Sequence, residues 1–181
     1  LIRDLIFLNR IPLFNTKKHV IALLYMIGSS IFLALLPNVT EQYQPEFVVG
    51  IFAMIWANDT FAYLTGKNFG RTKLFERISP KKTVEGFLGG LFFACISSFF
   101  IAKYTADVLD LKFTNWLILA IIVSVLGTFG DLIESKFKRQ AGAKDSGVIM
   151  PGHGGLLDRL DSIIFASPFI YLFLRIVHYV S

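Results

Sequence analysis

The sequence is short of cysteine and of charge, and each shortage excludes a class of protein. Its single cysteine, Cys95, lies in an apolar run, so neither a disulfide framework nor a cysteine-based metal site is available. Only 17% of the 181 residues are charged, whereas 54% are hydrophobic. The mean hydropathy of +0.60 is too high for an ordinary soluble domain.

The N-terminal residues lack the pattern of a secretory signal peptide. The chain begins at Leu1, and residues 1–12 mix apolar and charged residues without separate basic, apolar and cleavage regions. We therefore expect residues 1–181 to form one membrane domain, the C-terminal part of a longer chain. Residues 1–18 are expected to lie at the membrane interface or to end an earlier span.

Several apolar segments are long enough to cross a bilayer as α-helices. Each is close to the ~20 residues that the hydrocarbon core requires. The five segments cover approximately residues 19–36, 47–65, 86–105, 115–133 and 160–180. If all of them were buried helices of a soluble protein, too little polar surface would remain. The sequence therefore predicts an all-α polytopic membrane protein with about five transmembrane helices.

The connections between these segments alternate in charge. Lysine and arginine are concentrated before the first segment, in the loop over residues 66–85 and in the stretch over residues 135–161. By the positive-inside rule, these parts face the cytoplasm and the C-terminus lies outside. The net charge of +5 therefore indicates loops that face an anionic membrane surface, and no nucleic-acid partner is expected.

One acidic residue, Asp59, lies inside a predicted span. A carboxylate within a spanning segment is costly and usually faces a polar cavity or a partner. Tyr63 and Lys67 follow at intervals of four residues, so all three side chains share one helix face. This pattern favours a functional role for Asp59. The alternative is a hydrated carboxylate near the cytoplasmic end of the helix, paired with Lys67.

A serine and a proline stand near the end of the first basic loop, at Ser79 and Pro80. Serine is a favoured N-cap and proline suits the first helical position, so a helix is predicted to start here. Lys81 and Lys82 would add positive charge to the unpaired N–H groups of that helix start, which suits a phosphate. The alternative is a basic cluster that only obeys the orientation rule.

Glycines follow at the start of the third predicted span. Gly86 and Gly90 have the spacing of small residues that lets two membrane helices approach closely, and Gly89 lies between them. Close helix packing explains these glycines without a ligand.

Acidic residues stand at the facing ends of the fourth and fifth predicted spans. Asp131 and Ser135 are four residues apart, with Glu134 near them, and Asp158 and Asp161 are three apart. Carboxylates from two helices can hold Mg²⁺, which takes one or two carboxylates together with water and phosphate oxygens. The alternative is that the later pair binds neighbouring basic side chains or the N-terminal dipole of its own helix.

The connection over residues 135–161 is too rich in glycine and charge for a plain linker. Glycines let the backbone approach a ligand closely, and lysine and arginine match phosphate oxygens. His153, within Pro-Gly-His-Gly-Gly, is open to three interpretations: a ligand, an acid–base group or a turn residue. No second histidine or cysteine lies nearby, so a zinc site is not expected.

This stretch resembles the signature of the CDP-diacylglycerol synthase family, also called phosphatidate cytidylyltransferases. The resemblance is carried by Ser135, Phe137, Lys138, Arg139, Lys144, Asp145, Gly147, Pro151, His153, Gly154, Gly155, Leu156, Asp158, Arg159, Leu160 and Asp161. Met150 replaces the leucine, isoleucine or phenylalanine usual in the family. Blocks within residues 59–70 and 79–86 also resemble the family. Residues 58–181 are therefore expected to form a cytidylyltransferase core, although family members usually carry additional N-terminal spans.

The resemblance implies an enzyme of phospholipid biosynthesis that converts CTP and phosphatidate to CDP-diacylglycerol and pyrophosphate. It implies Mg²⁺ as cofactor, held by Asp131 and Asp158, and leaves a second cation open. The catalytic residues that it implies are Asp131, Asp158, Lys144 and Asp161. The substrate-binding residues that it implies are Asp59, Ser79, Lys81, Lys82, Thr83, Ser135, Lys138, Arg139, Asp145, His153 and Arg159.

The expected partners are CTP, phosphatidate and the lipid bilayer, and the sequence leaves a homodimer open. The expected location is a bacterial-type inner membrane, with two basic cytoplasmic loops forming the active site. Two other functions fit parts of the pattern. A CTP-dependent kinase of a polyprenol would share the metal site but release CDP. An ion-coupled transporter would use Asp59 and Asp131 as intramembrane charges, but no internal repeat supports it.

Overall fold

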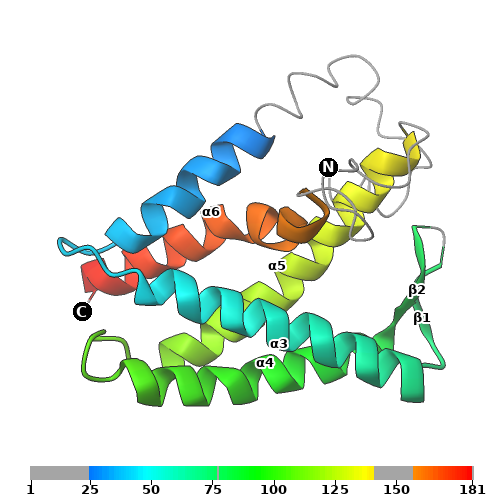
Figure 1. Ribbon diagram of the computed structural model, residues 1–181, viewed down its shortest axis with the longest axis horizontal. Coiled ribbons are helices and arrows are strands. Elements are labelled where there is room, and N and C mark those ends of the chain that lie inside the picture. The colour runs from blue at the N-terminus through cyan, green and yellow to red at the C-terminus, as the bar shows by residue number, and fades with distance from the viewer. Residues whose placement is uncertain (1–24, 77, 141–156, 181) are drawn as a thin grey trace.

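The computed structural model describes residues 25–76, 78–140 and 157–180, and this part of the chain is almost entirely helical (Figure 1). In the described part, residues 25–35 are helical and continue into the short 3-10 helix η1 (Leu36–Asn38). The longer helices are α3 (Glu46–Phe69), α4 (Val84–Thr105), α5 (Phe113–Gln140) and α6 (Leu157–Val180). The predicted all-α polytopic membrane fold is confirmed.

Four of these helices are long and apolar enough to cross a membrane. They are α3, α4, α5 as far as Arg139, and α6 from Leu160. Each contains one of the predicted spans over residues 47–65, 86–105, 115–133 and 160–180. The remaining predicted span, residues 19–36, overlaps the shorter apolar helix Tyr25–Asn38, and its residues 19–24 lie outside the described residues.

A two-stranded antiparallel sheet separates α3 from α4. Strand β1 (Lys73–Phe75) pairs with β2 (Ser79–Thr83), and Lys73 lies opposite Thr83. The hairpin rests on the C-terminal half of α5, because Phe75 packs against a small buried cluster that includes Leu132 and Ile133. The hairpin is thereby held beside the part of α5 that carries Asp131 and Glu134.

The prediction that a helix starts at Ser79 and Pro80 is wrong, because both residues belong to β2. Proline has no N–H to donate, but the edge of a sheet tolerates it. The helix starts at Val84 instead, because the hydroxyl of Thr83 accepts a hydrogen bond from the N–H of Gly86 at 3.1 Å. Thr83 is therefore the N-cap that was assigned to Ser79.

The long helices pack in neighbouring pairs, α3 with α4, α4 with α5, and α5 with α6 (Figure 1). The largest side chains buried between them come from α3, α5 and α6. They include Ile51, Met54, Trp116, Leu119, Ile163 and Ile170. The hydroxyl of Ser167 in α6 donates a hydrogen bond to the carbonyl oxygen of Ser29 at 2.8 Å, which joins the helical residues 25–35 to this core.

Glycines set the closeness of α3 and α4. A Cβ atom at Gly90 would lie 2.7 Å from the carbonyl oxygen of Asn58, and one at Gly86 would lie 2.8 Å from that of Ala62. A Cβ atom at Gly89 would meet Thr65 at 2.3 Å. The predicted packing role of these glycines is confirmed.

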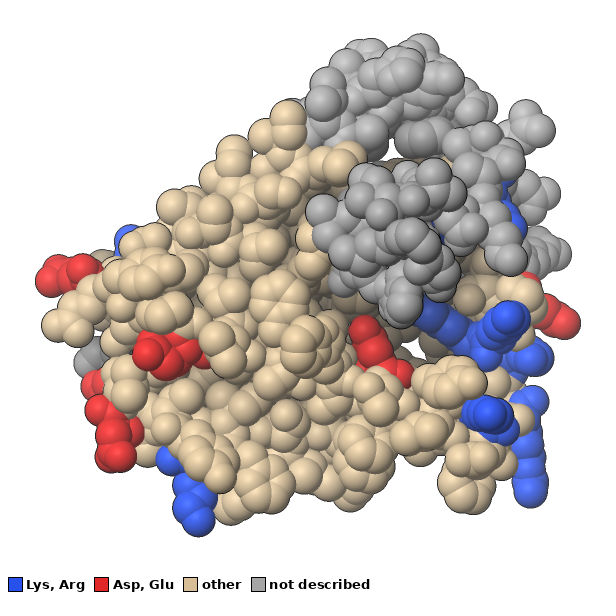
Figure 2. All heavy atoms as spheres, in the orientation of Figure 1, with Lys and Arg blue, Asp and Glu red and all other residues tan. Residues whose placement is uncertain are grey.

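The two ends of the helix assembly differ in charge (Figure 2). Lysine and arginine side chains gather at the hairpin end, where Arg71, Lys73 and Lys81 are exposed. At the opposite end, Glu41 and Asp107 are exposed in the connections between helices. Lys103 and Lys112 are exposed at that end too, so its charges are mixed, whereas the hairpin end is mainly basic.

Candidate active site

A cavity of about 830 Å³ opens at the hairpin end, between α3, the hairpin, α5 and α6. Its polar wall is formed by side chains of both charges and by hydroxyl and amide groups. These residues are Asn58, Asp59, Thr60, Tyr63, Lys67, Lys73, Lys81, Lys82, Thr83, Thr128, Asp131 and Asp161. Its apolar wall includes Phe52, Ile55, Trp56, Leu74, Phe87 and Ile163. Both the size and the mixed lining are typical of a small-molecule site.

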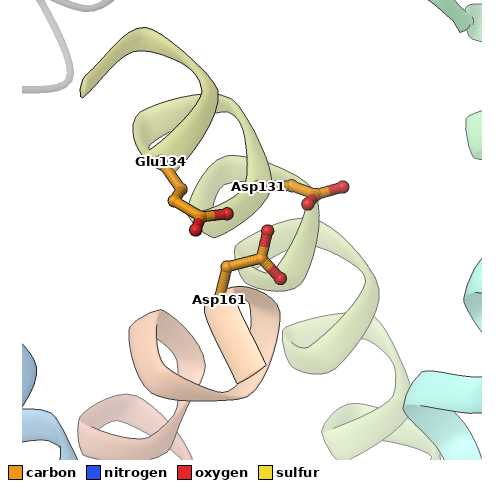
Figure 3. Close-up of side chains that lie close together, drawn as sticks. All are labelled: Asp131, Glu134 and Asp161. Atoms are coloured by element: carbon orange, nitrogen blue, oxygen red, sulfur yellow. The ribbon is translucent and has the colours of Figure 1, made fainter. Parts of the chain in front are cut away.

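Three carboxylates meet at the inner side of this cavity, those of Asp131 and Glu134 from α5 and of Asp161 from α6 (Figure 3). One oxygen of each lies within 4.8 Å of the others. Glu134 and Asp161 are only 4% and 6% exposed. Like charges this close and this buried repel one another strongly unless a cation, a proton or a donor offsets them.

The donor set of this carboxylate cluster fits a hard cation. Oε1 of Glu134 is buried and accepts no hydrogen bond from the described residues, so one acceptor is left for a ligand. Mg²⁺ prefers carboxylate oxygens and keeps positions for water and phosphate oxygens. Asp131 is the least enclosed of the three, with 35% of its side chain exposed, and it lines the cavity together with Asp161. A cation bound by these residues would therefore be accessible from the cavity.

Glycine brings the carboxylates together. A Cβ atom at Gly130 would lie 2.7 Å from the carbonyl oxygen of Asp161 and 2.8 Å from Cβ of Phe165. The hydrogen at this position thus lets α6 cross α5 directly beside Asp131. The carboxylate of Asp161 also accepts a hydrogen bond from the N–H of Ser162 at 2.7 Å, which helps to hold its orientation.

Two lysines flank the carboxylate cluster. Lys82 of β2 forms an ion pair with Asp131, so the hairpin contacts the cluster directly. On α5, Lys138 donates to Oε2 of Glu134 at 3.2 Å across one helical turn. Both lysines offset part of the negative charge of the cluster, and Lys82 also lines the cavity.

Asp59 faces the cavity from α3. Its carboxylate accepts a hydrogen bond from the side-chain amide of Asn58 at 3.2 Å. Lys67 does not form the ion pair considered from the sequence; its ammonium lies over the ring of Tyr63, 5.8 Å from the centroid. Since Asp59, Tyr63 and Lys67 all line the cavity, the prediction that they share one face is confirmed.

The cavity collects many of the residues that the sequence singled out. Those that line it are Asp59, Lys81, Lys82, Thr83, Asp131 and Asp161. Ser79, Ser135, Lys138 and Arg139 do not line it. Of these four, Lys138 contacts the carboxylate cluster through Glu134, and Arg139 is exposed near the end of α5.

The remaining predicted residues are not tested by the structure. Lys144, Asp145 and His153 lie outside the described residues. Asp158 and Arg159 belong to the first turn of α6, but their side chains are outside the described part. The predicted metal pair of Asp131 and Asp158 therefore stays a prediction.

Several residues of the site were not selected from the sequence, among them Glu134 and Lys73. Glu134 had a signal, since it lies three residues after Asp131 and so shares its helix face. Lys73 had none, because its place in the cavity depends on the hairpin and its register.

The sequence matches the profile of the cytidylyltransferase family over residues 4–177. It is 45% identical over 131 residues to the phosphatidate cytidylyltransferase of Staphylococcus aureus (strain COL). It is 43% identical over 136 residues to that of Bacillus subtilis (strain 168). These matches cover 71% and 75% of this chain and 49% and 50% of the relatives. The chain thus spans about half the length of the curated relatives that it matches.

Proposed function

This chain belongs to the cytidylyltransferase family, and from that premise we propose that it is the catalytic part of a membrane enzyme that joins CTP to phosphatidate. The products of the reaction are CDP-diacylglycerol and pyrophosphate. The observation that carries the proposal is the cavity itself, where lysines surround a carboxylate cluster and an apolar wall continues from it.

The reaction requires that the phosphatidate oxygen be aligned with the α-phosphorus of CTP and that the negative charge of the phosphate groups be neutralised. The phosphate of phosphatidate is already an oxyanion at neutral pH, so no strong general base is needed. One of its oxygens bonds to the α-phosphorus of CTP, the bond from that phosphorus to the oxygen bridging to the β-phosphorus breaks, and pyrophosphate leaves. Negative charge is spread over the phosphate oxygens in the transition state, and fixed cationic groups stabilise it.

The carboxylate cluster is the proposed Mg²⁺ site. Asp131, Glu134 and Asp161 supply oxygen ligands close enough to share one ion, and family resemblance adds Asp158. Bound there, Mg²⁺ would neutralise phosphate charge and help to orient CTP. Lys82 is held beside Asp131, so its ammonium also faces phosphate groups that reach the cluster.

The two walls of the cavity suit a substrate with a charged head and apolar chains. Along one face of α3, Phe52 and Trp56 come first and Asp59, Tyr63 and Lys67 follow toward the hairpin end, and all of them line the cavity. A lipid phosphate fits this order, with its head among the charged groups and its acyl chains along the apolar part and the bilayer.

The distribution of charge supports an orientation in the membrane. The cavity opens at the end where lysine and arginine gather (Figure 2), and such ends face the cytoplasm by the positive-inside rule. We therefore place the protein in a bacterial-type inner membrane with its active site on the cytoplasmic side, where CTP is available.

The test uses the full-length protein in mixed micelles with phosphatidate, Mg²⁺ and CTP labelled on the α-phosphate. Label should enter the lipid phase while an equal amount of pyrophosphate appears. Release of CDP together with a lipid phosphorylated from the γ position would favour the kinase alternative. Failure to convert any lipid phosphate or lipid alcohol would contradict the enzyme assignment.

A further inference from the structure

The carboxylate of Glu85, in the first turn of α4, accepts hydrogen bonds from the backbone of the turn that follows α3. The backbone N–H of Arg71 donates to its Oε2 at 3.1 Å, and the N–H of Thr72 donates to both of its oxygens at 3.1 Å. The N–H of Val84 donates in return to the carbonyl oxygen of Thr72 at 2.9 Å. These bonds hold the backbone at the point where β1 begins.

Glu85 does not line the large cavity. It borders a separate hollow of about 520 Å³ with Asn68, Phe69, Gly70 and Arg71. Because Glu85 lies outside the wall of the large cavity, we expect its effect on a ligand there to pass through the backbone that it holds.

The root of the hairpin is packed tightly on its other side by Thr83. A Cβ atom at Gly70 would lie 2.7 Å from Cγ2 of Thr83, and one at Gly66 would lie 3.0 Å from its Oγ1. The backbone of residues 70–72, where the hairpin begins, is thus held by its contact with Thr83 and by the hydrogen bonds to Glu85. Because the backbone of these residues is held in place, it determines the direction of strand β1, which begins directly after them.

Lys73 is the residue that this arrangement places. It follows Thr72 directly, lies opposite Thr83 in the sheet and lines the large cavity. Lys82 is paired with Asp131, but Lys73 has no carboxylate partner among the described residues. An ammonium group with no carboxylate partner in the described part of the chain, in the wall of a cavity that also holds a cluster of carboxylates, is suited to a phosphate group bound between them.

We propose that Glu85 is a positioning residue that holds Lys73 in the cavity wall, and that Lys73 binds a substrate phosphate. This inference rests on the proposed function. The phosphate comes from CTP or from the head of phosphatidate, and both present the same oxyanion chemistry to an ammonium group.

The first test compares Glu85→Ala and Lys73→Ala in the full-length enzyme in mixed micelles. CTP is varied at saturating phosphatidate, and phosphatidate is varied at saturating CTP. Both variants should raise the KM of the same substrate about tenfold with a much smaller change in kcat, as expected when a charged hydrogen bond to a substrate is lost. The substrate whose KM rises is the source of the phosphate. Wild-type KM values for both substrates in Lys73→Ala would overturn its assignment.

Matched controls separate this role from a general loss of charge. Glu76→Ala removes a carboxylate that lies directly after β1, accepts no hydrogen bond from the described residues and does not line the cavity. Lys103→Ala removes an exposed lysine near the far end of α4. Both should keep wild-type KM values. The double variant Lys73→Ala/Glu85→Ala should match Lys73→Ala within about twofold, and multiplied effects would overturn the link between the two residues.

The second test measures the backbone directly, by amide hydrogen exchange of the full-length protein in detergent without substrates. Glu85→Ala should speed exchange at Arg71 and Thr72, and Glu76→Ala should not. Glu85→Gln keeps one acceptor oxygen. Its exchange rates at Arg71 and Thr72 and its KM should therefore lie between those of Glu85→Ala and those of the wild type. Unchanged exchange in Glu85→Ala would overturn the positioning role. A wild-type enzyme without cytidylyltransferase activity would overturn the proposed function and the phosphate role of Lys73, while exchange would still decide the role of Glu85.

Discussion

The three carboxylates of the cluster have different surroundings, so their removal should have different effects. Asp131 is paired with Lys82 and partly exposed to the cavity. Asp161 is buried and its carboxylate accepts a hydrogen bond from the N–H of Ser162. Glu134 is also buried, and its Oε1 accepts no hydrogen bond from the described residues. Asp131 and Asp161 line the cavity, and Glu134 lies behind them. The first two should therefore matter most for turnover.

Asp131→Asn and Asp161→Asn should each lower kcat/KM at least about 100-fold, because each removes a charged ligand of the proposed metal site. The amide has nearly the same shape, so the protein should stay folded in detergent. Activity is measured with Mg²⁺, CTP and phosphatidate, and Asp107→Asn, an exposed residue at the other end, is the control. Nearly normal Mg²⁺-dependent rates in either cluster variant would contradict the metal assignment.

Glu134→Gln should act on the metal more than on the chemistry. Since Glu134 lies behind the cavity wall, its loss should raise the Mg²⁺ concentration for half-maximal activity about tenfold and leave much of the rate at saturating Mg²⁺. A Mg²⁺ titration measures this, with Glu76→Gln as the control. An unchanged titration curve would mean that Glu134 is not a ligand of the metal.

At the scale of elements, single glycines decide how closely two helices cross. Gly130 lets α6 approach α5, and Gly86 and Gly90 do the same for α4 and α3. Each crossing lies at the cavity, because Gly86 lines it and Asp131 follows Gly130. Packing between these helices and the geometry of the site are therefore linked.

Gly130→Ala should separate the carboxylates. Its Cβ atom would meet the carbonyl oxygen of Asp161 at 2.7 Å, so α6 must shift. We expect a loss of about 1–3 kcal/mol in unfolding free energy and a large loss of activity. Unfolding in detergent and the labelled-CTP assay measure the two effects. Gly28→Ala is the matched control, because no described atom lies within 4 Å of its added Cβ. Equal behaviour of the two variants would contradict the packing role of Gly130.

At the scale of the whole molecule, the cavity lies between the charged hairpin end and the apolar middle of the helices. Lysines and carboxylates line its polar wall, and side chains such as Phe52 and Trp56 line its apolar wall. In the proposed reaction, CTP would reach this cavity from the water and phosphatidate from the bilayer.

The orientation of the molecule can be tested by thiol labelling. In a Cys95→Ala background, a cysteine at exposed Arg71 should react with a membrane-impermeant reagent only from the cytoplasmic side. A cysteine at exposed Glu41 should react only from the outside. Right-side-out and inverted vesicles supply the two sides. The opposite pattern would place the active site away from CTP and contradict the proposed location.

Much of the architecture follows from properties that a single segment carries by itself. The length and apolar content of a span are local, so four predicted spans coincide with long helices. The shared face of Asp59, Tyr63 and Lys67 follows from helical periodicity alone, and all three line the cavity. The family resemblance also depends only on the order of residues, and the match over residues 4–177 confirms it.

The hairpin shows where local properties mislead. Ser79 and Pro80 suit a helix start and also an edge strand, and only the hydrogen bonds to β1 decide between them. These bonds join residues of two strands, so no propensity of the segment reveals them. The cap at Thr83 and the place of Lys73 in the cavity depend on the same pairing.

The sequence by itself therefore determined the membrane spans, their charge asymmetry, the family and most of the acidic and basic residues of the site. Only the tertiary structure decided which of these residues meet. It placed Glu134 with Asp131 and Asp161, paired Lys82 with Asp131 and brought Lys73 into the cavity. The physical reason is that such contacts depend on how closely helices cross and on strand register, and both are set by packing between segments distant in the chain.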